Sequence, residues 1–267
     1  MLTPLRQPQA AIEADLRHAL DRRQLAVWFQ PEVDLATRSI IAAEALLRWH
    51  HPSGELLAAD RFVDVAEETG LILDIGDWVL REACQQAVRW SQGRQGHPLT
   101  VRVNVSALQL AEGGLLDAID NALTDSGLNP RRLCLEITET SLLHETSAAR
   151  DNLVGIRQRG IRVAIDDFGT GYGSVTYLHR YPIDVLKIDR SFITDITTSE
   201  HDHRLVGGLI ALANHLGLSV TAEGVEHEDQ ASILRELGCP GAQGYLYSPA
   251  IPADELTRLL NAERASS

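Results

Sequence analysis

An alternation of short apolar runs with longer helical patterns dominates the chain from residue 25 onward. This pattern is typical of stacked βα units, in which helices join parallel strands. Eight strands are predicted, at Leu25–Phe29, Ile40–Leu47, Leu99–Val105, Leu133–Ile137, Arg162–Asp166, Val185–Ile188, Ser219–Ala222 and Ala242–Tyr245. Eight is the number that closes a (β/α)8 barrel, and such a barrel commonly needs about 250 residues. The 267 residues of this chain therefore suit one barrel domain.

Helical periodicity fills most segments between these strands, and glycine follows several of them, where it favours the left-handed cap conformation. The helices are predicted at Leu71–Trp90, Ala107–Ser126, Thr146–Arg159, His201–Leu216, His227–Leu237 and Ala253–Ala262. Only the ten residues Gln30–Ser39 separate the first two strands, which is too short for a crossover helix. The expected fold class is therefore α/β, a modified TIM (β/α)8 barrel with an antiparallel first strand. Residues 1–10 are expected to be a disordered or linker N-terminus, and residues 11–264 the domain.

Net charge and cysteine content limit which partners the protein can bind and in which cellular compartment it is expected. The net charge of −13 argues against binding to duplex nucleic acid, so an anionic substrate would have to meet local cations. Cys84, Cys134 and Cys239 are an odd number without a Cys-x-x-Cys pair, which argues against a disulfide framework or a zinc knuckle. No apolar run approaches the roughly 18 residues of a membrane span. We expect a cytoplasmic domain without direct membrane insertion, although a longer parent protein could be membrane-anchored.

Polar residues lie inside or at the end of nearly every predicted barrel strand. They are Glu44, Asn104, Glu136, Asp166, Asp167, Lys187, Glu223 and Gln243. Parallel barrels place their chemistry at the carboxyl ends of the strands, where buried carboxylates would lose their charge unless cations compensated them. Because every expected ligand is an oxygen, the ions should be Mg²⁺ or Mn²⁺. Two such ions are well suited to hydrolysis of a phosphodiester.

Individually, these residues have simpler explanations. A lone acid at a strand end is more often a helix cap or a surface group, and only the repetition at matching positions favours a site. Side chains alternate along a strand, so one of Asp166 and Asp167 can face the barrel while the other caps the following turn. Lys187 lies within the apolar run Val185–Ile188, where a buried lysine needs an acidic partner or a substrate anion.

The run Glu44-Ala45-Leu46-Leu47-Arg48-Trp49 resembles the signature of the EAL domain family, phosphodiesterases that act on the bacterial second messenger cyclic di-GMP. Further strings resemble the family in the same order, from about Leu16 to Leu260. They are Gln30-Pro31, Asn104-Val105-Ser106, Glu136-Ile137-Thr138-Glu139, Asp166 to Tyr172, Leu186 to Phe192, Ala222 to Glu226 and Gln243-Gly244-Tyr245. The strings cover nearly the whole chain.

The resemblance implies a role for each matching residue. Glu44, Asn104, Glu136 and Asp166 resemble the ligands of one metal, with Asp166 as a bridge and Asp167 and Glu223 as ligands of the second. Lys187 would position the attacking water, and Glu223 would assist removal of its proton. Gln30, Arg48, Asp189 and Gln243 resemble residues that contact or support the substrate, and Glu139 resembles the glutamate that anchors the loop after Asp167 and couples dimerisation to metal binding.

The implied reaction is metal-dependent hydrolysis of cyclic di-GMP to the linear dinucleotide pGpG, with two divalent cations, Mg²⁺ or Mn²⁺, and inhibition by Ca²⁺. A homodimer and regulatory domains in a longer protein are also implied. Gly173 departs from the family pattern and could loosen its loop. Two alternatives stay open: a catalytically weak or inactive cyclic di-GMP receptor, and a different metal-dependent barrel phosphodiesterase or enolase-like enzyme.

Overall fold

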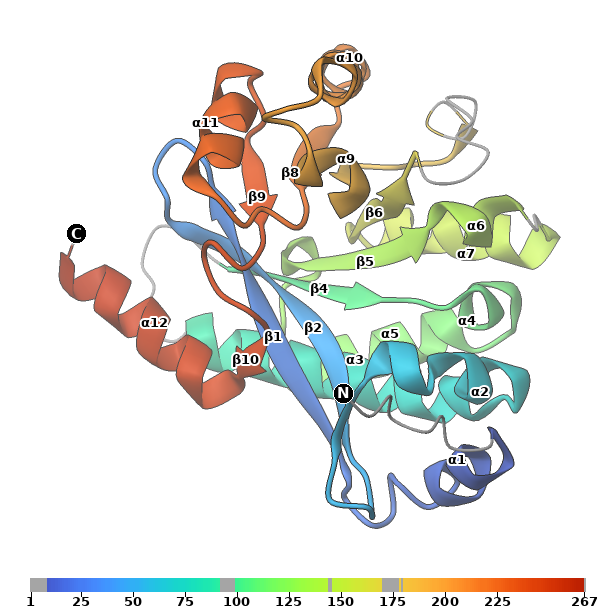
Figure 1. Cartoon of the computed structure of the whole chain (residues 1–267). Helices are drawn as coiled ribbons and strands as arrows, with labels where there is room; N and C mark the ends of the chain where they lie inside the picture. The colour runs from blue at the N-terminus through green and yellow to red at the C-terminus, as the bar shows by residue number, and fades with distance from the viewer. Residues whose placement is uncertain (1–8, 92–98, 144–145, 170–177, 179, 267) are drawn as a thin grey trace.

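A closed barrel lies at the centre of the fold in the computed structural model (Figure 1). The structure describes residues 9–91, 99–143, 146–169, 178 and 180–266. Its strands are β1 (Leu25–Asp34), β2 (Ile40–His50), β4 (Thr100–Asn104), β5 (Leu133–Thr138), β6 (Arg162–Phe168), β7 (Val185–Ile188), β8 (Ser219–Ala222) and β9 (Gly241–Gln243). They are hydrogen-bonded in this order, and β1 closes the ring by pairing with both β2 and β9. Both pairings of β1 within the ring are antiparallel and the others are parallel.

The expected fold class is thereby confirmed, including the antiparallel first strand. β1 and β2 form a hairpin in which Gln30 lies opposite Glu44. Two short strands were not expected: β3 (Leu56–Ala58) pairs with β2, and β10 (Ile251–Pro252) pairs with β1. The last predicted strand was placed too far along the chain, because β9 ends at Gln243.

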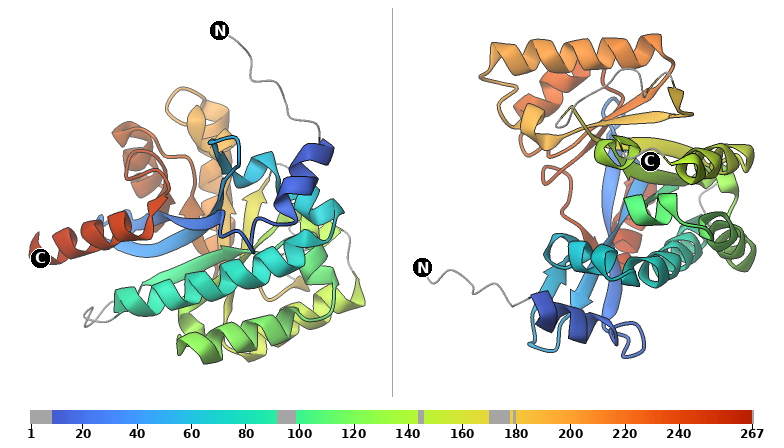
Figure 2. Two further views of the ribbon diagram at one scale, coloured as in Figure 1. Left: turned by 90° about the horizontal axis from the view of Figure 1, so that it is seen from below. Right: turned by 90° about the vertical axis from the view of Figure 1, so that its right-hand side faces the viewer.

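Helices surround the barrel (Figure 2). Their bounds are α1 (Gln9–Leu16), α2 (Val63–Glu68), α3 (Leu71–Ser91), α4 (Ala107–Ala111), α5 (Leu115–Ser126), α6 (Glu139–Leu143), α7 (Ser147–Gln158), α9 (Arg190–Thr194), α10 (Glu200–His215), α11 (Glu228–Glu236) and α12 (Ala253–Ser266), with short 3-10 helices η1 (Ala59–Arg61) and η2 (Pro130–Arg132). The prediction of one helix over Ala107–Ser126 is wrong, because this segment forms two helices, α4 and α5. The helical conformation is interrupted before α5, where Gly114 has a φ of 108°. The helix α1 begins inside the segment 1–10, and the domain limits stay a prediction.

The main hydrophobic core lies between the strands and the helices. Phe29 of β1 packs edge-on against Trp90 of α3, with ring centroids 4.7 Å apart, and Trp49 of β2 packs in the same way against Phe62. Burial of each such ring contributes about 1.5–3 kcal/mol. Within the described part of the chain, no helix is long and apolar enough to cross a bilayer.

A second, much smaller apolar cluster is separate from this core. It contains Cys134 of β5, Ala164 of β6 and Val185 of β7, all of them almost completely buried. Next to this cluster, Arg102 of β4 contacts Cys134, and charged side chains of β1, β4, β5 and β7 pair with one another. The barrel therefore encloses charged groups, and their pairing decides what it can bind.

Candidate metal-dependent active site

The ammonium of Lys187 lies at the centre of four carboxylates. Its Nζ is 2.6 Å from Glu223, 2.9 Å from Glu136, 3.3 Å from Asp166 and 3.4 Å from Glu44. Lys187 is completely buried and is the only lysine of the sequence. The sequence argument allowed an acidic partner or a substrate anion for this lysine, and the structure shows acidic partners.

Barrel closure assembles these groups from widely separated segments. Each lies in or directly after a different strand: Glu44 in β2, Asn104 at the end of β4, Glu136 in β5, Asp166 in β6, Lys187 in β7, Glu223 after β8 and Gln243 at the end of β9. The carboxyl ends of parallel strands meet at one edge of a barrel. Residues that are up to 199 positions apart, such as Glu44 and Gln243, are therefore hydrogen-bonded.

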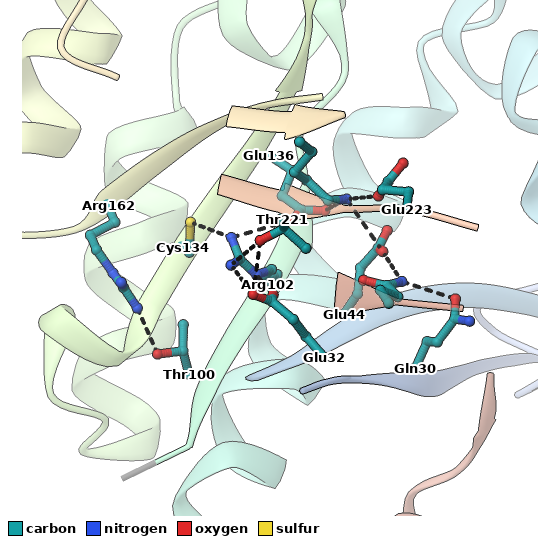
Figure 3. A network of polar contacts seen from close by, with 12 residues as sticks. Gln30, Glu32, Glu44, Thr100, Arg102, Cys134, Glu136, Arg162, Thr221 and Glu223 are labelled. Carbon is teal, nitrogen blue, oxygen red and sulfur yellow. Dashed lines mark hydrogen bonds and ion pairs between the residues drawn. The ribbon is translucent and has the colours of Figure 1, made fainter. Parts of the chain in front are cut away.

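Amide side chains hold the Glu44 carboxylate. Asn104 Nδ2 donates to Glu44 Oε1 at 2.8 Å, and Gln243 Nε2 donates to Oε2 at 2.7 Å. The same Gln243 nitrogen donates to Gln30 Oε1 at 2.9 Å, so Gln30 is linked to the acidic centre through one amide (Figure 3). Burial alone would raise the pKa of Glu44, but Lys187 and the two amides lower it below the ordinary value.

The side chains of Asp166 and Asp167 were expected to point to opposite sides of the strand, and this expectation is wrong. The pairing of β6 with β7 shifts between Ile165 and Phe168, so the two aspartates lie opposite the single residue Lys187. Asp167 takes a left-handed conformation with φ of 53°. This bulge lets both carboxylates reach the same cavity, because the extra residue interrupts the regular up-and-down order of side chains.

The site carries more negative charge than Lys187 neutralises. Burial and the neighbouring Glu44 and Asp166 raise the pKa of Glu136 well above its ordinary value, although Lys187 opposes the effect. Burial also raises the pKa of Glu223 to about 8, against the influence of Lys187. The pKa of Asp167 is raised by burial and by Asp166. These raised pKa values reflect an excess of negative charge that further cations would offset.

Among the described residues, two groups of carboxylates have the spacing to hold metal ions. Oxygens of Glu44, Glu136 and Asp166 lie within 4.8 Å of one another, and so do oxygens of Asp166, Asp167 and Glu223. The two groups together contain five carboxylates. If all five are ionised, the single ammonium of Lys187 leaves four negative charges uncompensated, which equals the charge of two divalent cations. An all-oxygen set with a shared aspartate fits hard ions such as Mg²⁺ or Mn²⁺.

A cavity of about 490 Å³ opens above this centre. Gln30 and Asp189, two of the expected substrate residues, line it together with Arg190 and Tyr245. Arg48 is not among its lining residues; its guanidinium lies 5.6 Å from the centroid of the Trp28 ring. Burial lowers the pKa of Arg48, while Asp60 and Tyr245, which both line the cavity, favour its charge. Arg48 therefore does not line the cavity but feels the charge of residues that do.

Glu139 contacts the segment that follows Asp167. Its Oε2 accepts a hydrogen bond from Gly169 N at 3.1 Å, and the side chain is 1% exposed. Gly169 has φ of 100°, and a Cβ there would lie 2.9 Å from the ring of Phe192, so both its conformation and its surroundings require glycine. The rest of the loop, including Gly173, lies outside the described residues, and the expected effect of Gly173 stays a prediction.

Sequence reasoning missed a buried ionic group next to the acidic centre. Arg102 of β4 forms two hydrogen bonds to Glu32 of β1, and Thr221 of β8 donates to the same carboxylate at 2.8 Å (Figure 3). Strand alternation could have indicated that Arg102 points into the barrel. Arg102 lies two residues before Asn104, so the two side chains lie on the same face of β4. The sequence could not show which residue would neutralise it.

A family model described as EAL domain matches residues 13–250. The chain is 44% identical to the bifunctional diguanylate cyclase/cyclic di-GMP phosphodiesterase MucR of Pseudomonas aeruginosa, over 94% of this chain and 36% of that protein. It is 43% identical to the cyclic di-GMP phosphodiesterase NbdA of the same organism, over 95% of this chain and 32% of that protein. The chain thus spans about a third of the length of these curated relatives.

Solved structures show the same fold. A complex described as PaMucR phosphodiesterase with c-di-GMP has a TM-score of 0.87 at 43% identity, covering 92% of this chain and 99% of that one. The EAL enzyme Bd1971, in its form with cAMP and cyclic di-GMP bound, has a TM-score of 0.90 at 29% identity, covering 94% of this chain and 69% of that one.

Proposed function

Since the chain belongs to the EAL domain family, we propose that it hydrolyses cyclic di-GMP to linear pGpG with two divalent cations. The observation that carries the proposal is the pair of carboxylate groups that share Asp166 around the buried Lys187. The names of the relatives MucR and NbdA support the substrate and the reaction class. The complex of the MucR phosphodiesterase with c-di-GMP supports the same ligand.

In this proposal Glu44, Asn104, Glu136 and Asp166 hold one ion, and Asp166, Asp167 and Glu223 hold the other. The bound ions would supply a reactive hydroxide from water and offset the charge that develops on the phosphate. The protein contributes the fixed orientation of the ligands. Asn104 and Gln243 each hold one oxygen of Glu44, so that this carboxylate cannot rotate freely.

Lys187 and Glu223 are the proposed proton-handling pair. Their side chains are 2.6 Å apart, and Lys187 keeps its charge because the four surrounding carboxylates raise its pKa well above the ordinary value despite burial. Lys187 would position and polarise the attacking water. Glu223, deprotonated when it holds the ion, would assist removal of the proton that the water releases.

The cavity walls supply the proposed substrate contacts. Gln30 and Asp189 offer polar groups inside the cavity. Arg48, whose charge is favoured by Asp60 and Tyr245 of the cavity, offers a forked cation, which suits a phosphate. Gln243 would support Gln30 through their hydrogen bond. Glu139 would keep the loop after Asp167 in place through Gly169.

The direct test is to incubate the purified domain with cyclic di-GMP and Mg²⁺ or Mn²⁺ and to separate the products by chromatography. We expect pGpG to accumulate, and none with Glu44→Gln, which keeps the size of the side chain but removes its charge. Tight binding without product would instead favour the receptor alternative. Turnover of other phosphodiesters in the absence of activity on cyclic di-GMP would favour a different barrel phosphodiesterase.

Homodimerisation and attachment to regulatory domains are also proposals. They are supported by family membership and by the greater length of MucR and NbdA. Light scattering on the domain with and without Mn²⁺ would measure the oligomeric state. A monomer under both conditions would exclude the dimer for this part of the protein.

A further inference from the structure

A buried ion pair lies beside the acidic centre and has no place in the proposed chemistry. Arg102 Nε is 2.5 Å from Glu32 Oε2, and Arg102 Nη2 is 2.9 Å from Glu32 Oε1. The exposed fractions of the two residues are 4% and 2%. The Thr221 hydroxyl bridges the two residues of the ion pair, because it donates a hydrogen bond to Glu32 and accepts one from Arg102 at 3.4 Å. The guanidinium is thereby fixed in one orientation.

This guanidinium also reaches one of the expected metal ligands. Arg102 Nη1 lies 3.7 Å from Glu136 Oε1, while Lys187 Nζ lies 2.9 Å from Glu136 Oε2. Glu136 is completely buried, and its Oε1 accepts no hydrogen bond from the described residues. A different cation therefore lies near each oxygen of this carboxylate, and Arg102 is the only described cation near Oε1.

The surrounding strands make room for the pair. A Cβ on Gly241 of β9 would lie 2.9 Å from Glu32 Oε1, so glycine at that position leaves space for the carboxylate. Glu32 itself lies opposite Gln243 in the pairing of β1 with β9. Desolvating two charges is costly, and apolar residues of similar size are often as stable or more so. Stability alone is therefore a weak explanation for an ion pair at this place.

We propose that Arg102, held by Glu32, is a positioning residue that fixes the Glu136 carboxylate in the orientation needed to hold a divalent cation. The proposal rests on the proposed function only in that Glu136 is taken as a metal ligand. Arg102 acts through Glu136 and does not touch the substrate. Loss of the pair should therefore change metal affinity even where the fold is kept.

The test compares the wild type with the double variant Glu32→Leu/Arg102→Met, which replaces both charges by apolar groups of similar size. We expect a Tm equal to or above that of the wild type. We expect Mn²⁺ binding, measured by calorimetry, to weaken by about 10- to 100-fold, as is usual when groups that orient a ligand are lost. Arg162→Met is the matched control, since Arg162 donates to Thr100 and should leave Mn²⁺ affinity unchanged.

A second variant keeps the proposal falsifiable if the double variant does not fold. Arg102→Lys retains the charge but lacks the fork that holds Glu32 in two places, so Mn²⁺ binding should again weaken. Wild-type Mn²⁺ affinity in either folded variant would overturn the proposal and leave the pair a purely structural one. Mn²⁺ binding by the wild type without hydrolysis of cyclic di-GMP would count against the proposed function alone.

Discussion

Asp166 and Asp167 are consecutive in β6, yet both lie opposite the single residue Lys187 of β7 and both line the same cavity. The hydrogen bond from Asp167 N to Asp166 Oδ1, at 3.0 Å, lies within this bulge. One irregularity of the sheet thus supplies the two neighbouring carboxylates that the second expected ion requires.

Asp167→Asn should remove one ion and leave the other. Asparagine tolerates the left-handed conformation of Asp167, so the bulge should be kept while the charge is lost. We expect the stoichiometry of tight Mn²⁺ binding to fall from two to one, as measured by calorimetry. Asp189→Asn, which changes a residue outside both carboxylate groups, is the control. Two ions bound with unchanged affinity would contradict the role of Asp167.

Glu44→Ala and Asp166→Asn should each abolish hydrolysis with the fold intact. Both side chains are expected to ligate metal. Mutation of groups that only orient a metal ligand already lowers activity by about 10- to 100-fold, so loss of a ligand itself should cost more. We expect losses greater than about 100-fold in kcat/KM, with an unchanged circular dichroism spectrum. Substantial turnover by either variant with Mg²⁺ would refute the metal assignment.

Metal affinity should rise with pH between about 6.5 and 8.5. Without metal, the pKa of Glu223 is about 8, so an ion must displace a proton from this carboxylate below that pH. Calorimetry in two buffers of different ionisation enthalpy should detect the released proton, and Glu223→Gln should reduce the release. Equal affinity and no proton release at pH 6.5 and 8.5 would contradict the prediction.

The same raised pKa predicts how the stability of the metal-free protein depends on pH. The pKa of Glu223 is higher in the folded state than the ordinary 4.5, so between about 4.5 and 8 the folded state binds more protons than the unfolded state. The contribution of Glu223 to the free energy of unfolding should therefore fall as pH rises through this range. Urea unfolding with chelator, compared with Glu223→Gln, measures this contribution; no difference in slope would contradict it.

Lys187 offers a single spectroscopic reporter because the sequence contains no other lysine. Protein expressed with isotope-labelled lysine and without lysine in any tag should show one side-chain signal. Four carboxylates raise the pKa of Lys187 well above 10.5, so its Cε shift should stay that of a charged ammonium beyond pH 10.5. Titration near the ordinary lysine value would show that these contacts do not persist in solution. Unfolded protein is the control.

Ca²⁺ should support binding of cyclic di-GMP but not its cleavage. Ca²⁺ is larger than Mg²⁺ and takes longer, less regular coordination, so the same carboxylates should hold it without the regular geometry that the attacking water requires. We expect Ca²⁺ to compete with Mn²⁺ and to stop product formation. Rapid formation of pGpG in Ca²⁺ alone would argue against a tightly spaced pair of ions.

The sequence by itself determined the barrel, its antiparallel first strand and most of the acidic centre. These features follow from local quantities: the length of Gln30–Ser39, the alternation of strand and helix patterns, and acids at strand ends. Lys187 could be assigned acidic partners because an isolated charge is costly in an apolar strand. Each inference needs only the chain near the residue concerned.

Only the tertiary structure decided where Asp167 points and what neutralises Arg102. The bulge at Asp167 depends on the pairing of β6 with β7, and strand alternation within β6 alone predicts the opposite side. Glu32 and Arg102 are 70 residues apart and meet only because β1 closes the barrel. Contacts across a closed sheet depend on the register of all its strands, which no single segment of sequence specifies.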